Sequence, residues 1–205
     1  MSARKKCIFV LCFCIFGIQN FSIAQRLSFH ADLGMAFPNE KNIKSGFESG
    51  FGFSLPLMRK IFLGLNFGHW KSSVHKEVGK LYEGKLSVTP FFFSLQFKPM
   101  EKNTINPYVL FGVSIVFARF EIGEYISIPE VTISQKIRNG LGLHIEGGSD
   151  LHLTENLAFF AAMNYLFWKT KAETTISDMN FGLSTEEFSI RLDSLILKVG
   201  MKYFF

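Results

Sequence analysis

Three residues on two neighbouring segments could form a nucleophilic site. Ser114 lies in one segment, and His144 and Glu146 lie two residues apart in the next. If the chain reverses at the midpoint of residues 119–139, Ser114 lies roughly opposite His144, with Glu146 on the same face. A hydroxyl, an imidazole and a carboxylate are what a serine hydrolase uses, the carboxylate orienting the base. Such trios are common in chains of this size, and this one points toward the less apolar face, so we interpret it as structural.

A larger set of ionisable residues falls on that same face. Lys198 and Lys202 lie in the last segment, which a closed sheet would place beside the first segment and Asp32. Buried charges must pair, because desolvation is costly otherwise. We therefore expect an ion-pair and hydrogen-bond plug in which Asp32 pairs with Lys198 or Lys202, and no catalytic, cofactor or metal site. The predicted network comprises His30, Asp32, Glu48, His144, Glu146, Asp150, Lys198 and Lys202.

Strands must position these residues. Apolar residues recur at every second position, which is the period of a strand with two unlike faces. Leu86 and Val88 are out of phase with Phe91, so around Pro90 we expect a bulge or a late strand start. The eight predicted strands cover residues 27–37, 47–55, 61–68, 91–97, 109–117, 140–148, 157–167 and 195–205.

The connections between these strands alternate in length. Short ones lie at 56–60, 98–106 and 153–156, and longer polar ones at 38–45, 71–85, 119–139 and 169–192. An even number of strands, with short turns at one end and long loops at the other, is typical of a transmembrane barrel. The sequence thus predicts an all-β fold, an eight-stranded antiparallel up-and-down transmembrane β-barrel.

The composition of the less apolar face favours this barrel over a soluble β-sandwich. A sandwich would present many Lys, Glu and Thr residues to water there, but this face is mostly Gly, Ser, Asn and Ala. Glycines suit the narrow interior that eight strands enclose, and large apolar side chains then face lipid. We expect Trp70, Tyr108, Tyr165 and Trp168 to be interfacial rings near the strand ends. The predicted space-saving glycines are Gly34, Gly50, Gly52, Gly64, Gly68, Gly112, Gly142, Gly148 and Gly200.

The N-terminus has the composition of a secretory signal peptide. Basic residues 4–6 precede an apolar run at 7–18, and small residues at 22 and 24 suit a cleavage site. Twelve apolar residues are too few to cross a bilayer as a helix, which takes roughly 20. We expect residues 1–24 to be the signal peptide and 25–205 the barrel domain. All three cysteines, Cys7, Cys12 and Cys14, lie in the first part, so the mature chain would have no disulfide.

Composition and charge exclude two further classes of protein. The 205 residues are 48% hydrophobic and only 19% charged, with 25 phenylalanines, which excludes a disordered chain. There are 22 basic and 17 acidic residues, but three basic residues lie in the predicted signal peptide. Without a later cluster of Lys and Arg, we expect no nucleic-acid partner.

Three segments resemble a known family of outer-membrane proteins. The last strand ends in Tyr203-Phe204-Phe205, similar to the C-terminal signal that bacterial barrels present to the barrel assembly machinery. Residues 106–112, Asn-Pro-Tyr-Val-Leu-Phe-Gly, resemble the fifth strand of the outer-membrane β-barrel domain family, which includes the OmpA transmembrane domain, OmpX and PorT-like proteins. Residues 153–157, Leu-Thr-Glu-Asn-Leu, resemble its last periplasmic turn. The resemblance implies an outer-membrane location and Tyr203 and Phe205 as an assembly signal.

These expectations combine into one functional hypothesis. We expect a non-enzymatic outer-membrane barrel with a structural or surface-interaction role and a plugged lumen that excludes a porin function. Residues 119–139 and 169–192 could extend as hairpins that offer edges or aromatic rings to a partner. Outer-membrane lipids, lipopolysaccharide and a surface or secretion-system protein are the expected partners. The alternatives are a PorT-like accessory part of a secretion system, and a lipid A deacylase or acyltransferase.

Overall fold

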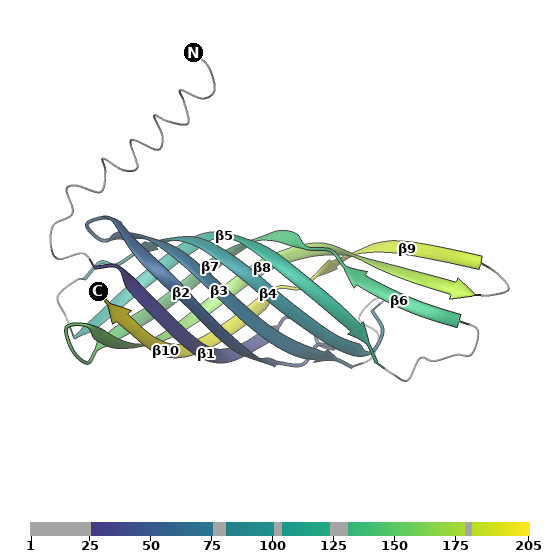
Figure 1. The fold of residues 1–205 in the computed structure, drawn as a ribbon, viewed down its shortest axis with the longest axis horizontal. Helices are drawn as coiled ribbons and strands as arrows, with labels where there is room; N and C mark the ends of the chain where they lie inside the picture. The colour runs from purple at the N-terminus through teal and green to yellow at the C-terminus, as the bar shows by residue number, and fades with distance from the viewer. Residues whose placement is uncertain (1–25, 76–80, 101–103, 124–130, 179–181) are drawn as a thin grey trace, which may run out of the picture.

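The computed structural model describes residues 26–75, 81–100, 104–123, 131–178 and 182–205, and it shows a β-barrel with a projecting sheet (Figure 1). The predicted signal peptide lies outside the described residues. Within the described ranges, no helix has the length and apolar composition needed to cross a membrane. The barrel strands are β1 (Ser28–Pro38), β2 (Gly46–Met58), β3 (Ile61–Val74), β4 (Gly84–Phe97), β5 (Ile105–Ile122), β7 (Gly140–His152), β8 (Leu157–Asp178) and β10 (Ser194–Phe204).

The eight strands close into a ring because the last pairs with the first. Each strand runs antiparallel to its neighbours, and β10 pairs with β8 on one side and with β1 on the other, from Ser28 opposite Phe204 to Pro38 opposite Ser194. Closure pairs the first and last strands of the described barrel, as hydrocarbon requires, because backbone groups there cannot bond to water. The predicted eight-stranded barrel is confirmed.

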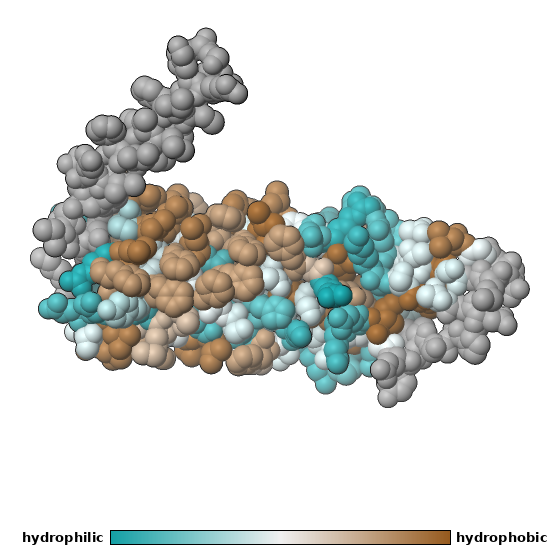
Figure 2. All heavy atoms as spheres, in the orientation of Figure 1, coloured by the Kyte–Doolittle hydropathy of each residue, from teal (hydrophilic) through white to brown (hydrophobic). Residues whose placement is uncertain are grey.

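Large apolar side chains form the outer surface of the barrel. Phe51, Phe67, Phe91 and Phe117 make successive ring contacts across β2 to β5, with centroids 4.8 to 6.1 Å apart. Figure 2 shows hydrophobic side chains gathered over the body of the barrel, and hydrophilic ones toward the end with the projecting sheet. Glycines on the inner face make room: a Cβ on Gly148 would lie 2.6 Å from the Tyr108 ring.

The sequence prediction of a bulge or late strand start near Pro90 is wrong. Strand β4 runs unbroken from Gly84 to Phe97, and its register with β3 is the same on both sides of Pro90. Leu86 and Val88 point inward, in phase with Pro90. The apolar pattern changes phase only because the inward positions 86 and 88 carry apolar side chains. The interior of the barrel is therefore apolar beside this part of β4.

Three of the four expected interfacial rings lie inside the barrel instead. Trp70 and Trp168 are each 1% exposed, and Tyr108 is 3% exposed, whereas Tyr165 is half-buried. The alternation of the strands explains the error. Each of these rings lies on the same face as an inward-facing glycine of its own strand or of the strand beside it. Rings near strand ends can fill a lumen as well as anchor at an interface.

Beyond the barrel, three strands form a sheet that projects from the end with the long loops (Figure 1). Strand β6 (Val131–Ile137) pairs with the distal part of β8 on one side, and β9 (Gly182–Arg191) pairs with it on the other. We call β6, the distal part of β8 and β9 the extension sheet. The expected hairpin extension of residues 169–192 is thus present. Residues 131–137 also extend as a strand, but they pair with β8 and not with β5.

Candidate functional site

The interior of the barrel is the candidate site, and the strand alternation positions its side chains. Every second residue of each barrel strand points inward, so polar groups from all eight strands meet in one narrow volume. The structure places all eight predicted network residues there, each at most 7% exposed. They are His30, Asp32, Glu48, His144, Glu146, Asp150, Lys198 and Lys202.

At the end with the short turns, Asp150 accepts from two lysines. Its Oδ2 lies 2.9 Å from Lys98 Nζ and its Oδ1 lies 2.7 Å from Lys202 Nζ. The Lys98 ammonium also lies 5.0 Å from the centroid of the Phe62 ring. Sequence reasoning missed Lys98, because it placed the residue in a turn. In the structure Lys98 follows β4 directly and keeps the inward parity of Gln96.

In the middle of the barrel, Glu146 is the centre of the network. Its Oε2 lies 2.8 Å from Lys198 Nζ and accepts a hydrogen bond of 3.0 Å from Asn164 Nδ2. Its Oε1 accepts a hydrogen bond of 3.0 Å from the Tyr108 hydroxyl. Neither Asn164 nor Tyr108 was predicted here, although their inward parity on β8 and β5 is readable from the sequence. The carboxylate is thus fully engaged by its neighbours.

Asp32 does not make the expected ion pair. Lys198 and Lys202 flank it on β10, opposite Gly34 and His30, but both side chains reach past β8 to carboxylates of β7. Asp32 Oδ2 lies 3.7 Å from His30 Nε2. Glu48 lies close by, since Oδ1 of Asp32 and Oε1 of Glu48 would lie 2.8 and 3.1 Å from a Cβ on Gly50.

The possible catalytic trio does not assemble either. In the ladder between β5 and β7, Ser114 faces Gly142, and His144 faces Gly112. His144 Nε2 lies 2.9 Å from Ser94 Oγ of β4, while Ser114 Oγ has no hydrogen-bond partner among the described residues. The register differs by two residues from the expected one, because the chain does not reverse at the midpoint of 119–139. No proton path therefore runs from Ser114 through His144 to Glu146.

At the end with the long loops, the interior is apolar. Trp70 and Trp168 pack there with Leu86, Val88 and Phe92 in one cluster of buried side chains, together with Val116, Phe120, Ile137, Leu166, Ile190, Leu192 and Ile196. We call this the apolar layer, and the charged set below it the ion-pair layer. The sequence signal that could have found it is the inward parity of Trp70, which follows Gly64 and Gly68 on β3.

The two layers occupy the interior at different levels. Charged and hydrogen-bonded groups lie toward the short turns, and large apolar side chains lie toward the long loops. No group of three or more potential metal ligands occurs among the described residues. The arrangement therefore supports a closed interior.

The extension sheet carries a second set of charges, which faces outward. Arg138 bonds to Glu173 and lies 2.7 Å from Glu187, and Lys171 Nζ lies 2.6 Å from Glu187. The hydrogen bond from Lys171 is the main cause that lowers the pKa of Glu187 below its usual value. The hydrogen bond to Glu173 raises the pKa of Arg138. These exposed pairs connect β8 to β9 and to the end of β6.

Comparison with known proteins assigns the chain to a structural class. The profile of the OmpW family matches residues 40–205. The crystal structure of the outer membrane protein OprG from Pseudomonas aeruginosa is similar, with a TM-score of 0.73 and 19% identity over 90% of this chain and 99% of that one. Neisserial surface protein A gives a TM-score of 0.60 and 14% identity over 87% and 97% of the two chains.

A third similar structure is the outer membrane protein AlkL in lipid bilayers, with a TM-score of 0.56 and 16% identity over 91% and 93% of the two chains. At these identities the likeness shows the fold alone. No curated protein gives a significant match.

Proposed function

The chain belongs to the OmpW family of outer-membrane proteins, and we propose that it has a surface-interaction role above a lumen closed to water-soluble solutes. The general expectation of a small outer-membrane barrel is confirmed. The closer resemblance to OmpA, OmpX and PorT-like proteins is not, because the family is OmpW. Those three matched segments reflect constraints that many small barrels share.

The extension sheet is the observation that carries this proposal. Within the described residues, β6 and β9 each pair only with β8, so the outer edge of each strand has no strand partner. An exposed strand edge can add a strand from another chain, with main-chain hydrogen bonds providing affinity. The sheet also projects beyond the barrel end, where a partner outside the membrane can reach it (Figure 1).

Site-specific photo-crosslinking in intact cells tests this role. A photoreactive residue at exposed Ser184 of β9 should form adducts with a protein, whereas one at lipid-facing Leu197 of β10 should not. Both positions are exposed in the isolated chain, so the comparison controls for accessibility. Equal protein adducts from both positions, or none from Ser184 in a folded barrel, would contradict the proposal.

We also propose that the protein is not an enzyme. The proposal is supported by His144, which bonds to Ser94 and lies opposite Gly112, not opposite Ser114, in the ladder. Lipid A from cells with the wild type, with Ser114→Ala or without the protein should therefore give indistinguishable mass spectra. A difference that tracks Ser114 would support the lipid-modifying alternative. Neither this alternative nor the secretion-system alternative is favoured by the comparisons.

A specific observation supports a second candidate function, the passage of small apolar molecules. The ladder between β5 and β7 ends at Val116 opposite Gly140, and above it β5 pairs with β4 while β6 pairs with β8. The Ala118 N–H is bonded to the Asn139 side chain, at 3.2 Å, where a ladder would use a backbone carbonyl. The wall beside the apolar layer thus lacks a backbone ladder at this seam.

Uptake of an apolar fluorescent dye by whole cells tests this second candidate. The wild type should speed uptake, and Val116→Asp, which puts a charge beside the seam, should abolish the gain. Val116→Ile is the matched apolar control, and heat-modifiable migration verifies that each variant is folded. Equal uptake by cells with Val116→Asp and with Val116→Ile would exclude the seam as a route.

A further inference from the structure

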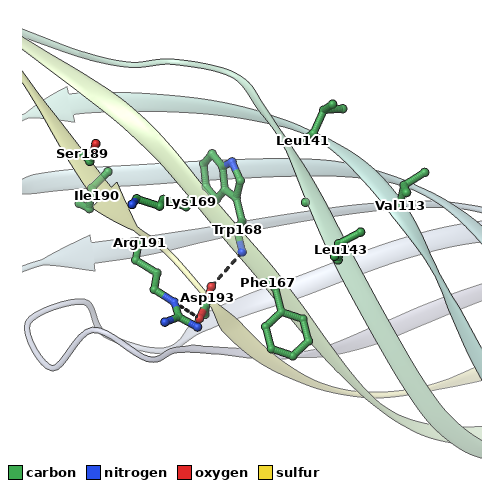
Figure 3. A pocket seen from close by; sticks show the side chains of 11 residues that line it. Val113, Leu141, Leu143, Phe167, Trp168, Lys169, Ser189, Ile190, Arg191 and Asp193 are labelled. Atoms are coloured by element: carbon green, nitrogen blue, oxygen red, sulfur yellow. Dashed lines mark hydrogen bonds and ion pairs between the residues drawn. The ribbon is translucent and has the colours of Figure 1, made fainter.

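A groove on the outer surface of the barrel lies where β8 exchanges partners. On one edge of β8, β7 pairs up to Gly142 opposite Trp168, and β6 pairs further along, from Ile137 opposite Ala172. On the other edge β10 and then β9 pair with β8 in one register, with Arg191 opposite Lys169. The sheet surface is hollowed at the exchange, and the cavity measures about 770 Å³. Figure 3 shows Val113, Leu141 and Leu143 at one end of the groove, and Lys169 and Arg191 at the other.

The apolar end of this groove faces the hydrocarbon. Leu141 is 76% exposed and Leu143 is 61% exposed, and Phe167 and Val113 beside them are also exposed. All four side chains point outward in the alternation, at the same level as the apolar band of the barrel. An acyl chain can lie along this surface and bury it.

The other end of the groove is cationic and is placed just above the apolar band. Lys169 is the outward-facing residue that follows Phe167 on β8, about 7 Å further along the strand. It lies directly opposite Arg191 of β9, on the same face. Two like charges directly opposite each other destabilise a strand pair unless an anion lies between or beside them.

The carboxylates of the chain near this pair are already engaged. Asp193 accepts a hydrogen bond from the Trp168 N–H at 2.9 Å, and its Oδ2 lies 2.5 Å from Arg191 Nε. Glu187, the next carboxylate along β9, bonds to Lys171 and Arg138. Within the described residues, Lys169 has no ion-pair partner, and the Arg191 side chain is 69% exposed.

We propose that this groove binds one phosphorylated, acylated lipid of the outer leaflet, with an acyl chain on Leu141, Leu143 and Phe167 and a phosphate on Lys169 and Arg191. The long-loop end of an outer-membrane barrel faces the outside, so the groove opens to the outer leaflet. A phosphate between the two cations makes charge-assisted hydrogen bonds and removes their mutual repulsion. The lipid thereby covers the point at which the wall changes partners.

Native mass spectrometry of the purified full chain, titrated with diphosphoryl hexa-acyl lipid A, tests the proposal. One lipid should bind to the wild type, and lipid A without phosphates should bind more weakly. Lys169→Gln should weaken binding of the phosphorylated lipid about tenfold, since it removes one charge-assisted contact. Lys169→Arg should retain the affinity. Lys85→Gln, at an exposed strand lysine outside the groove, is the matched control and should change nothing.

Two results would overturn the proposal. One is equal affinity of Lys169→Gln and the wild type for diphosphoryl lipid A. The other is equal affinity of the wild type for lipid A with and without phosphates, which would assign the contact to acyl chains alone. Within the part of the chain that the structure describes, the Lys169 side chain makes no hydrogen bond or ion pair, so its replacement should leave the barrel folded, and heat-modifiable migration verifies this.

Discussion

Single residues determine how the charge inside the barrel is balanced. Asp150 lies against two lysines, Glu146 against one lysine and two neutral donors, and Asp32 against His30. A buried carboxylate without a cation is costly, so the long side chains of Lys198 and Lys202 extend past β8 to β7. Which carboxylate each lysine selects depends on distances across the barrel and not on the pairing of neighbouring strands.

The pair between Lys198 and Glu146 gives the first prediction at this scale. Lys198→Met leaves Glu146 buried without its cation and should lower the free energy of unfolding by about 3–5 kcal/mol. Adding Glu146→Gln removes the unpaired charge and should restore most of this loss. Urea unfolding in lipid vesicles, followed by tryptophan fluorescence, measures both variants. A double variant as unstable as Lys198→Met alone would contradict the assigned pair.

Ser94 of β4 and Ser114 of β5, on the two strands before β7 in the sheet, give a second prediction. Ser94→Ala leaves the His144 ring without its hydrogen-bond partner and should destabilise the barrel by about 1–3 kcal/mol. Ser114→Ala removes a buried hydroxyl that has no partner, so stability should stay the same or rise. The same unfolding measurement compares the two. If Ser114→Ala lost more stability than Ser94→Ala, the assignment of the His144 hydrogen bond to Ser94 would be contradicted.

At the scale of elements, β8 links the two parts of the molecule. Its 22 residues begin in the barrel wall between β7 and β10 and end in the extension sheet between β6 and β9. The outward side chains change along it from Phe167 to Lys169 and Lys171, so one strand leaves the lipid and enters water. The length of the connection at 169–192 predicted the hairpin. The sequence could not predict that β6 would pair with β8. Both strands are polar there and have the same alternation of residues, so neither pattern selects a partner.

Stability of the extension sheet should depend on pH through Glu187. Its lowered pKa means that the charged form stabilises the sheet above the ordinary pKa of 4.5, and that this contribution is lost as the pH falls through the lowered value. Backbone amide chemical shifts of residues 182–191, followed from about pH 7 to about pH 3, should change as Glu187 takes up a proton, while the barrel stays folded. Glu187→Gln should remove most of this dependence. An unchanged profile in that variant would show that another group governs it.

Strand β10 gives a prediction about assembly, which rests on the proposal that Tyr203 and Phe205 form the signal read by the barrel assembly machinery. The Phe205 N–H also donates to Leu27 O at 3.0 Å, where the last strand meets the first. Deletion of Phe205 should sharply lower the yield of heat-modifiable barrel and leave protease-sensitive chain in the periplasm. Unchanged folded yield would exclude the terminal aromatic as the signal. Phe205→Tyr, which keeps an aromatic ring, should behave like the wild type.

For the whole molecule, the barrel could be predicted from the sequence, but its family could not. In each of the eight strands, apolar side chains alternate with smaller or polar ones, because one face meets lipid and the other meets a narrow interior. This alternation predicts an eight-stranded ring. The same pattern occurs in any small barrel, so it does not separate OmpW from OmpA-like proteins. The apolar layer around Trp70 and Trp168 was not predicted either. Tryptophans near strand ends are equally expected at a membrane interface, which is why the layer was missed.

Conductance of the purified full chain in planar lipid bilayers tests the closed interior most directly. If the ion-pair layer and the apolar layer close the lumen, as we propose, the folded barrel should show no conductance above that of protein-free membrane in potassium chloride. Tryptophan fluorescence and heat-modifiable migration of the same sample establish that the protein is inserted and folded. A steady, reproducible single-channel conductance from such a sample would contradict the account of a barrel closed by its own side chains.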